Sequence, residues 1–209
     1  TTIVGAEEGV VHLKDKDVKG AIQACVTHKD KVRDNPRVMS DIENILAHIH
    51  LSSRDMEEAK AHLQASIHMD ARNMASYMTL AAVYLREENP DKAVSLYHRA
   101  LEQNQDYFPA AMALGMAYER ADDLDRAEKY YRNVLEIHPE YGPAANNLSY
   151  VLSKKGDRTT ENVQLAEFAK SKDPTNPYVL DTLGWAYYLN GRHVAALDEF
   201  NRAIEIKPD

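Results

Sequence analysis

The 209-residue sequence contains little cysteine, glycine and proline, and it has no long hydrophobic run. The single cysteine, Cys25, excludes a disulfide within the chain and fits either the cytoplasm or the periplasm. Eight glycines and eight prolines leave little room for the turns of an all-β fold. No apolar run approaches the ~18 residues of a membrane span, and no signal peptide is recognisable. We therefore expect an all-α protein without a span, cut from a longer chain.

Charge and motif content narrow the possible functions. The formal net charge of −8 provides no basic surface for a nucleic acid, so we expect no nucleic-acid partner. Among the nine histidines, His48 and His50 are two residues apart and would point to different faces of a helix. The sequence contains no phosphate-binding loop, nucleophile elbow, dinucleotide fingerprint or zinc-protease motif. We predict a non-enzyme with no metal, no cofactor and no catalytic residue.

What the sequence does contain is an internal repeat. The segments YMTLAAVYLREENPDKAVSLYHRALE (77–102), AMALGMAYERADDLDRAEKYYRNVLE (111–136) and LDTLGWAYYLNGRHVAALDEFNRAIE (180–205) align without gaps. Leucines recur 34 residues apart at positions 46, 80, 114 and 148, and one extra residue precedes Leu183. In each unit a small residue follows the leucine, an aromatic comes three later, and an alanine follows the turn. This pattern predicts pairs of antiparallel helices.

Two glycines lie inside the predicted first helices, although glycine costs roughly 0.5–1 kcal/mol there relative to alanine. Gly115 and Gly184 occupy the position that Ala47 and Ala81 take in other units. We expect this position to face the second helix of the same repeat, where a side chain would hold the two helices apart.

These positions resemble the tetratricopeptide repeat family, whose 34-residue helix–turn–helix signature combines a large residue, Leu-Gly, Tyr, Ala, an aromatic, Ala and Pro. The last unit matches at Leu180, Leu183, Gly184, Tyr187, Ala196, Phe200, Ala203 and Pro208. The fourth unit matches at Ala111, Leu114, Gly115, Tyr118, Ala127, Tyr131, Val134 and Pro139. The resemblance implies a right-handed α-solenoid. The last two units of the sequence resemble repeats of bacterial envelope, secretion and exopolysaccharide proteins. This favours an envelope-associated protein, in the cytoplasm or the periplasm.

The repeat predicts the organisation of the whole chain as one array. We expect a degenerate unit at 2–39, followed by units at 40–73, 74–107, 108–141, 142–176 and 177–209. Cys25 falls at a core position of the first unit, and Asn162 of the fifth unit replaces the usual alanine. Turn signals agree with this frame: Asn89, Asp55 and Asp123 can cap second helices, and Gly156 and Gly191 follow first helices.

The resemblance also implies a binding groove lined by the first helices. The groove residues that we predict are Asn44, His48, Met78, Met112, Met116, Asn146, Asn147, Tyr150, Asp181, Trp185 and Tyr188. Methionine adapts to varied partners, and tryptophan and tyrosine are enriched in binding hot spots, although such residues also pack between neighbouring helices. Arg86, Arg120 and Lys154 form a possible basic rim for an acidic partner. The neighbours of Asn147 are not cationic, so a carboxylate clamp is not expected.

The sequence thus predicts a non-catalytic scaffold that binds a peptide or helix of a partner protein in the groove. An alternative is an assembly or oligomerisation module of a bacterial envelope, secretion or exopolysaccharide complex, with self-association through the repeat ends. A third interpretation is the accessory domain of a longer enzyme.

Overall fold

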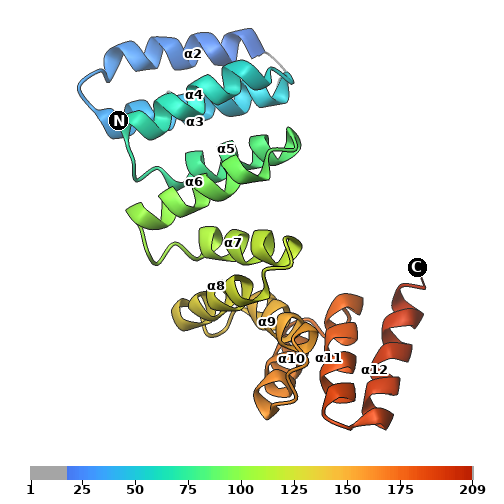
Figure 1. Cartoon of the computed structure of the whole chain (residues 1–209). Coiled ribbons are helices and arrows are strands. Elements are labelled where there is room, and N and C mark those ends of the chain that lie inside the picture. The colour runs from blue at the N-terminus through green and yellow to red at the C-terminus, as the bar shows by residue number, and fades with distance from the viewer. Residues whose placement is uncertain (1–17, 209) are drawn as a thin grey trace. The chain divides into compact units, whose positions relative to one another are not determined.

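In the computed structural model, which describes residues 18–208, the chain forms eleven α-helices and no strand (Figure 1). The predicted all-α helical repeat is confirmed. The first half of the expected unit at 2–39 lies outside the described residues. The chain divides into two compact units, Thr1–Gln105 and Asp106–Asp209, which we describe in turn.

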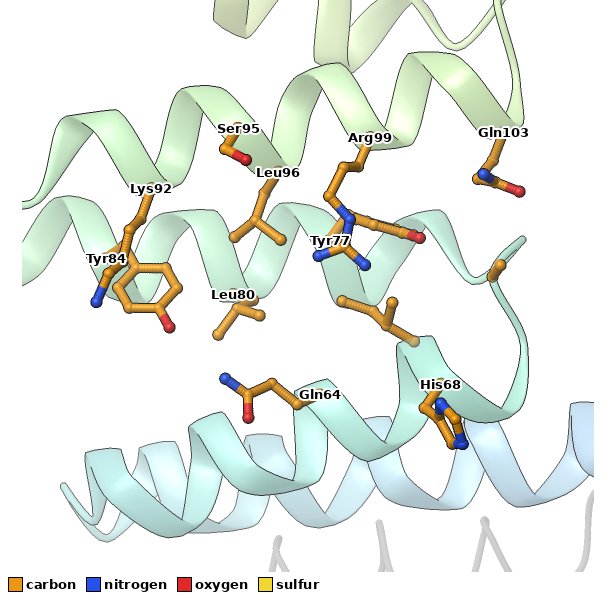
Figure 2. A pocket seen from close by; sticks show the side chains of 12 residues that line it. Gln64, His68, Tyr77, Leu80, Tyr84, Lys92, Ser95, Leu96, Arg99 and Gln103 are labelled. Atoms are coloured by element: carbon orange, nitrogen blue, oxygen red, sulfur yellow. The ribbon is translucent and has the colours of Figure 1, made fainter.

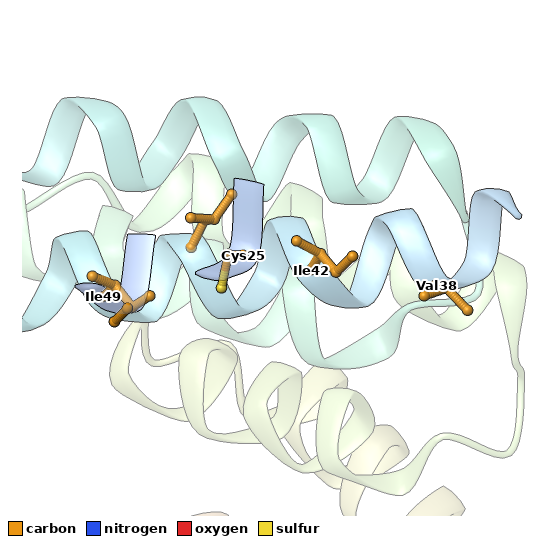
Figure 3. Packing of buried hydrophobic residues seen from close by; sticks show 6 residues of the cluster. Cys25, Val38, Ile42 and Ile49 are labelled. Atoms are coloured by element: carbon orange, nitrogen blue, oxygen red, sulfur yellow. The ribbon is translucent and has the colours of Figure 1, made fainter. Parts of the chain in front are cut away.

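In its described part, residues 18–105, the first unit contains one helix and two helix pairs. Its helices are α2 (Val18–Lys31), α3 (Pro36–Ser52), α4 (Met56–Met69), α5 (Met74–Arg86) and α6 (Pro90–Gln103). Cys25 of α2 is buried against Ile42 and Ile49 of α3 (Figure 3), as its place in the repeat predicts. Burial raises the pKa of its thiol, which keeps the sulfur in its neutral form. Cys25 is therefore a packing residue.

The second unit contains three helix pairs. Its helices are α7 (Phe108–Arg120), α8 (Leu124–Ile137), α9 (Gly142–Lys154), α10 (Thr160–Lys172), α11 (Pro177–Leu189) and α12 (His193–Ile206). Each first helix packs against the second helix of its own pair, and α9 also packs against α8 and α11. The core follows these contacts: Tyr131 of α8 lies with Leu148 and Val151 of α9.

The predicted turn signals are confirmed. The side chains of Asn89, Asp55 and Asp123 cap α6, α4 and α8. Each accepts a hydrogen bond from the backbone N–H of the residue three positions later. Gly156 and Gly191 follow α9 and α11 with φ values of 76° and 74°. The equivalent positions in the other pairs are Arg54, Glu88 and Asp122, and they adopt the same left-handed conformation without being glycine. The turn geometry therefore repeats even where the sequence does not.

The helical glycines mark close helix contacts. A Cβ atom on Gly115 would lie 2.5 Å from Cε1 of Tyr131, and one on Gly184 would overlap the ring of Phe200. In both cases the ring belongs to the second helix of the same pair. The predicted reason for these glycines is confirmed, because a side chain at either position collides with an aromatic ring.

Candidate protein-binding surface

The first helices of the second unit present a set of exposed aromatic and apolar side chains. Met116 of α7, Tyr150 of α9 and Trp185 of α11 are exposed and occupy equivalent repeat positions, and Tyr188 is exposed one turn beyond Trp185. Large apolar side chains that gather on one face of a soluble protein commonly mark interaction sites. We call these four residues, together with Tyr178, the aromatic surface.

Trp185 is the best-defined member of this surface. Its ring is packed edge-on against Tyr188, with centroids 5.7 Å apart, and against Phe200, with centroids 5.6 Å apart. The side chain nevertheless remains 48% exposed. An aromatic anchor that is already oriented loses little conformational entropy on binding, so its contact area converts efficiently into affinity.

Two cavities flank Trp185. One has a volume of about 290 Å³ and lies between α9 and α11, lined by Tyr150, Ser153, Lys154, Thr182 and Trp185. The other has a volume of about 370 Å³, and its lining includes Tyr178, Asp181, Trp185, Phe200 and Ile204. The hydroxyl of Thr182 donates to the carbonyl of Tyr178 at 2.9 Å, which leaves its methyl group as the uncommitted part of the side chain. The site can therefore take apolar side chains on both sides of the indole.

Two asparagines supply polar groups on α9. Asn146 Nδ2 donates to Asn147 Oδ1 at 3.2 Å, and Asn147 Nδ2 donates to the hydroxyl of Tyr131 at 3.3 Å. Burial and a hydrogen bond to Glu119 raise the pKa of Tyr131 far above its ordinary value, so this hydroxyl keeps its proton. Within residues 18–208, the buried Oδ1 of Asn146 has no hydrogen-bond partner.

The remaining predicted residues of the second unit have mixed roles. Met112 is half-buried and packs against the core of α8 and α9. Asp181 lines the larger of the two cavities, and desolvation by the residues around it raises the pKa of its carboxyl group. Of the basic rim, Arg120 is exposed, whereas Lys154 forms an ion pair with Asp122 at 2.7 Å and lies 5.9 Å from the Tyr150 ring. Lys154 is thus partly neutralised within the chain.

The predicted residues of the first unit do not form a comparable surface. Asn44 Nδ2 donates to the hydroxyl of Ser76 at 2.8 Å and so links α3 to α5. Met78 is half-buried, and His48 and Arg86 are exposed. The aromatic surface is therefore assembled entirely from the second unit.

Tyr178 belongs to this surface and occupies an inner-surface position of the last repeat, but it is not among the predicted groove residues. It is 64% exposed, and Lys207 Nζ donates to its hydroxyl at 2.6 Å while lying 4.8 Å from its ring centroid. The available signal was an aromatic residue at the second position of the last repeat, where the fourth and fifth repeats carry Pro109 and Pro143.

Two further observations concern the described part of the chain. No group of three or more histidine, cysteine, aspartate or glutamate side chains in residues 18–208 could hold a metal ion. In the same range, every helix is too short or too polar to cross a membrane.

Comparison with known proteins identifies the fold. Family models described as tetratricopeptide repeat match residues 50–117, 84–149 and 177–209. This chain belongs to the tetratricopeptide repeat family. A comparison with curated proteins finds no matching relative.

Several solved tetratricopeptide and related structures share the arrangement of helices. YrrB, described as a tetratricopeptide repeat protein with an unusual peptide-binding site, is 18% identical, with a TM-score of 0.71 over 89% of this chain and 93% of its own. A repeat protein from Parabacteroides merdae is 16% identical, with a TM-score of 0.71 over 98% of this chain and 79% of its own. The MamA protein is 18% identical, with a TM-score of 0.68 over 81% of this chain and 92% of its own. At these identities the likeness concerns the fold alone.

Proposed function

We propose that this protein is a non-catalytic interaction scaffold that binds a peptide or helix of a partner through the aromatic surface of its second unit. A tetratricopeptide fold supports a protein-interaction role in general. The observation that carries the specific proposal is Trp185, which is half exposed, held in place by Tyr188 and Phe200, and flanked by two cavities. The peptide-binding site described for YrrB adds support from a protein of similar fold.

In the proposed complex, apolar side chains of the partner fill the two cavities beside Trp185. Buried aromatic anchors of this kind commonly contribute about 2 kcal/mol or more to affinity. The amide groups of Asn146 and Asn147 on α9 bond to each other and to Tyr131, so we expect them to hold this part of the surface in place rather than to contact the partner. Exposed ion pairs contribute only about 0–1 kcal/mol, so we expect the basic rim to matter less.

The single tryptophan makes this proposal directly testable. Peptides selected from a random displayed library on the intact chain should shift or quench the emission of Trp185 on binding. We expect Trp185→Ala to weaken binding of these peptides by about 30-fold or more, because it removes the central anchor.

The matched control is Lys129→Ala, at an exposed position on the second helix α8, which should change affinity less than about twofold. Circular dichroism should show both variants folded. Peptides that bind without affecting the tryptophan emission, and equally well to Trp185→Ala, would show that the partner binds elsewhere.

A second candidate function is self-assembly through the last helix. Val194, Leu197 and Ile204 of α12 are exposed, Val194 by 87%. Leu197 is the repeat equivalent of Val163, which is buried with Leu183 and Ala186 of α11. The last pair thus exposes a surface whose equivalent in the preceding pair is covered by α11. A second copy of the chain could cover it.

Sedimentation velocity at increasing concentration tests this alternative. We expect association that Leu197→Glu abolishes and Trp185→Ala preserves. A chain that sediments as a monomer at all concentrations would rule out assembly through α12.

A further inference from the structure

A second candidate site lies in the first unit, on the side of the second helices. A cavity of about 640 Å³ is lined by residues of α4, α5 and α6 (Figure 2). Its volume falls within the range of ordinary ligand pockets. The aromatic surface belongs to other helices and to the other unit, so this cavity is a separate feature.

The floor of the cavity is apolar. Tyr77 and Leu80 of α5, Leu96 of α6 and Ile67 of α4 line it, and all four are buried. Because they are buried as part of the repeat core, the floor does not depend on a ligand for its shape. It offers a rigid contact for one or two apolar side chains.

One wall of the cavity carries two cations. Lys92 Nζ lies 4.8 Å from the ring centroid of Tyr84, and the guanidinium of Arg99 lies 5.3 Å from that of Tyr77. Both side chains are exposed and lie on α6 (Figure 2). An aromatic ring orients a cation without neutralising its charge, so both groups remain available to an anion.

The local charge of the cavity is opposite to that of the whole protein. None of its lining residues is acidic, and neither Lys92 nor Arg99 forms an ion pair within the described part of the chain. Nearby Lys60 differs, because it pairs with Glu57 and Glu87 at 2.7 Å. A cavity with two unpaired cations in a protein of net charge −8 is suited to a negatively charged ligand.

We propose that this cavity binds an extended acidic segment of a partner protein, with two carboxylates that reach Lys92 and Arg99. The two cations are seven residues apart on one helix, which separates them by two turns, or about 10.5 Å. In an extended polyproline-type segment, residues three apart lie on the same face and are about 9.3 Å apart. A segment with acidic residues three apart therefore matches the spacing, with an apolar residue between them for the floor.

The opposite wall supplies further polar groups. Gln64 and His68 of α4 lie across the cavity from α6 (Figure 2), and Gln103 lies near the end of α6. Amide groups can both donate to and accept from the backbone of an extended segment, which has no internal hydrogen bonds of its own. The cations of α6, together with the amides of Gln64 and Gln103, would hold such a segment along the length of α6.

A labelled peptide tests this proposal. The probe has the order glutamate, leucine, proline, glutamate, leucine between glycines, and its partner peptide has glutamine in place of both glutamates. In fluorescence anisotropy on the intact chain, we expect saturable binding of the acidic peptide and at least tenfold weaker binding of the glutamine peptide. Raising the salt concentration should weaken binding of the acidic peptide, since the contacts are exposed ion pairs.

Variants of the protein locate the site. Lys92→Gln/Arg99→Gln should lower the affinity for the acidic peptide at least tenfold. The control Lys31→Gln/Arg54→Gln removes the same two charges from exposed positions of the same unit and should change it less than twofold. Ser95→Tyr, which narrows the cavity without changing its charge, should also weaken binding. Trp185→Ala should leave binding unchanged, which separates this site from the aromatic surface.

Three results would overturn the proposal. The first is equal binding of the acidic and glutamine peptides. The second is an equal loss of affinity in the control pair, which would indicate attraction by net charge alone. The third is tighter binding of a single-stranded oligothymidylate than of the acidic peptide, which would point to a nucleic acid as the ligand.

Discussion

The two units build the same helix pairs with different interiors. In the first unit, buried hydroxyl groups bond to one another: Ser66 Oγ lies 2.7 Å from that of Ser76 and 2.8 Å from that of Ser40. In the second unit, the equivalents of Ser66 and Ser76 include Val134 and Ala144, both fully buried. The repeat frame thus accepts polar or apolar residues at these positions, provided that buried hydroxyls find partners.

The two units also differ in the residue at the close contact between the two helices of a pair. The first unit has Ala47 and Ala81 at this contact, whereas the second has Gly115 and Gly184 in its first and last pairs and Ser149 in its middle pair. The missing side chain lets an aromatic ring from the second helix reach the first helix. In the last pair this ring is Phe200, which also contacts Trp185. Glycine in the core therefore contributes to the shape of the aromatic surface.

The largest expected effect comes from removing this difference. Gly184→Leu and Gly115→Leu should each lower the free energy of unfolding by about 1–3 kcal/mol, because the new side chain collides with Phe200 or Tyr131. Thermal and denaturant melts measure the change. Ala82→Leu, at an exposed position of α5, is the control and should change stability by less than about 0.5 kcal/mol. Unchanged midpoints for both glycine variants would contradict the close helix contact.

A smaller effect is expected where the second unit does bury a polar pair. Ser149 Oγ donates to Asn162 Oδ1 at 2.6 Å, and Asn162 Nδ2 donates to Ser153 Oγ at 3.0 Å. Asn162→Ala restores the residue common at this repeat position but removes the amide that both hydroxyls bond to, leaving Ser149 Oγ only its 3.2 Å bond to the backbone carbonyl of residue 162. We expect a loss of about 1–2 kcal/mol in denaturant unfolding, since unpaired buried polar groups are costly.

The exposed Asn201→Ala variant is the control for this substitution. An increase in stability for Asn162→Ala would mean that the repeat consensus outweighs the hydrogen bonds.

The smallest effects concern the turns after the first helices, where the first unit has Arg54 and Glu88 and the second has Asp122 and two glycines in the same left-handed conformation. Gly191→Ala should cost about 1 kcal/mol from its φ of 74° alone, because a Cβ atom there meets no other atom within 4 Å. Glu88→Gly, at the equivalent turn of the first unit, should change stability by about 0.5 kcal/mol or less, since relief of strain offsets the added freedom of the unfolded chain. Melts of both variants measure this difference. Equal costs would show that the turns do not share one backbone geometry.

Much of the fold could be predicted from the sequence because its signals are local and repeated. The 34-residue period predicts the helix pairs, and single residues such as Asn89 and Asp123 predict where second helices begin. Even the contact at Gly184 follows from the period, because the period aligns Gly184 with small residues in other repeats.

The candidate site could be predicted only in part. The sequence indicated Trp185, Tyr150 and Tyr188 as surface residues, but it did not indicate that two cavities flank the indole. Asn44 and Asn147 were both predicted to face the groove, yet each bonds within its own unit, Asn44 to Ser76 and Asn147 to Tyr131. Position in a repeat gives the face of a helix, whereas the partners of a side chain depend on the neighbouring repeats.

By itself the sequence determined the helical repeat, the turns and the close helix contacts, because each depends on residue types at short or periodic separations. Only the tertiary structure decided which charges are paired. Glu43 is buried and accepts from His62 Nδ1 at 2.6 Å and from Lys29, residues of two other helices. Lys92 and Arg99, by contrast, face a cavity formed by three helices. Charge pairing depends on distances of a few ångströms between side chains from different helices, and no period in the sequence encodes them.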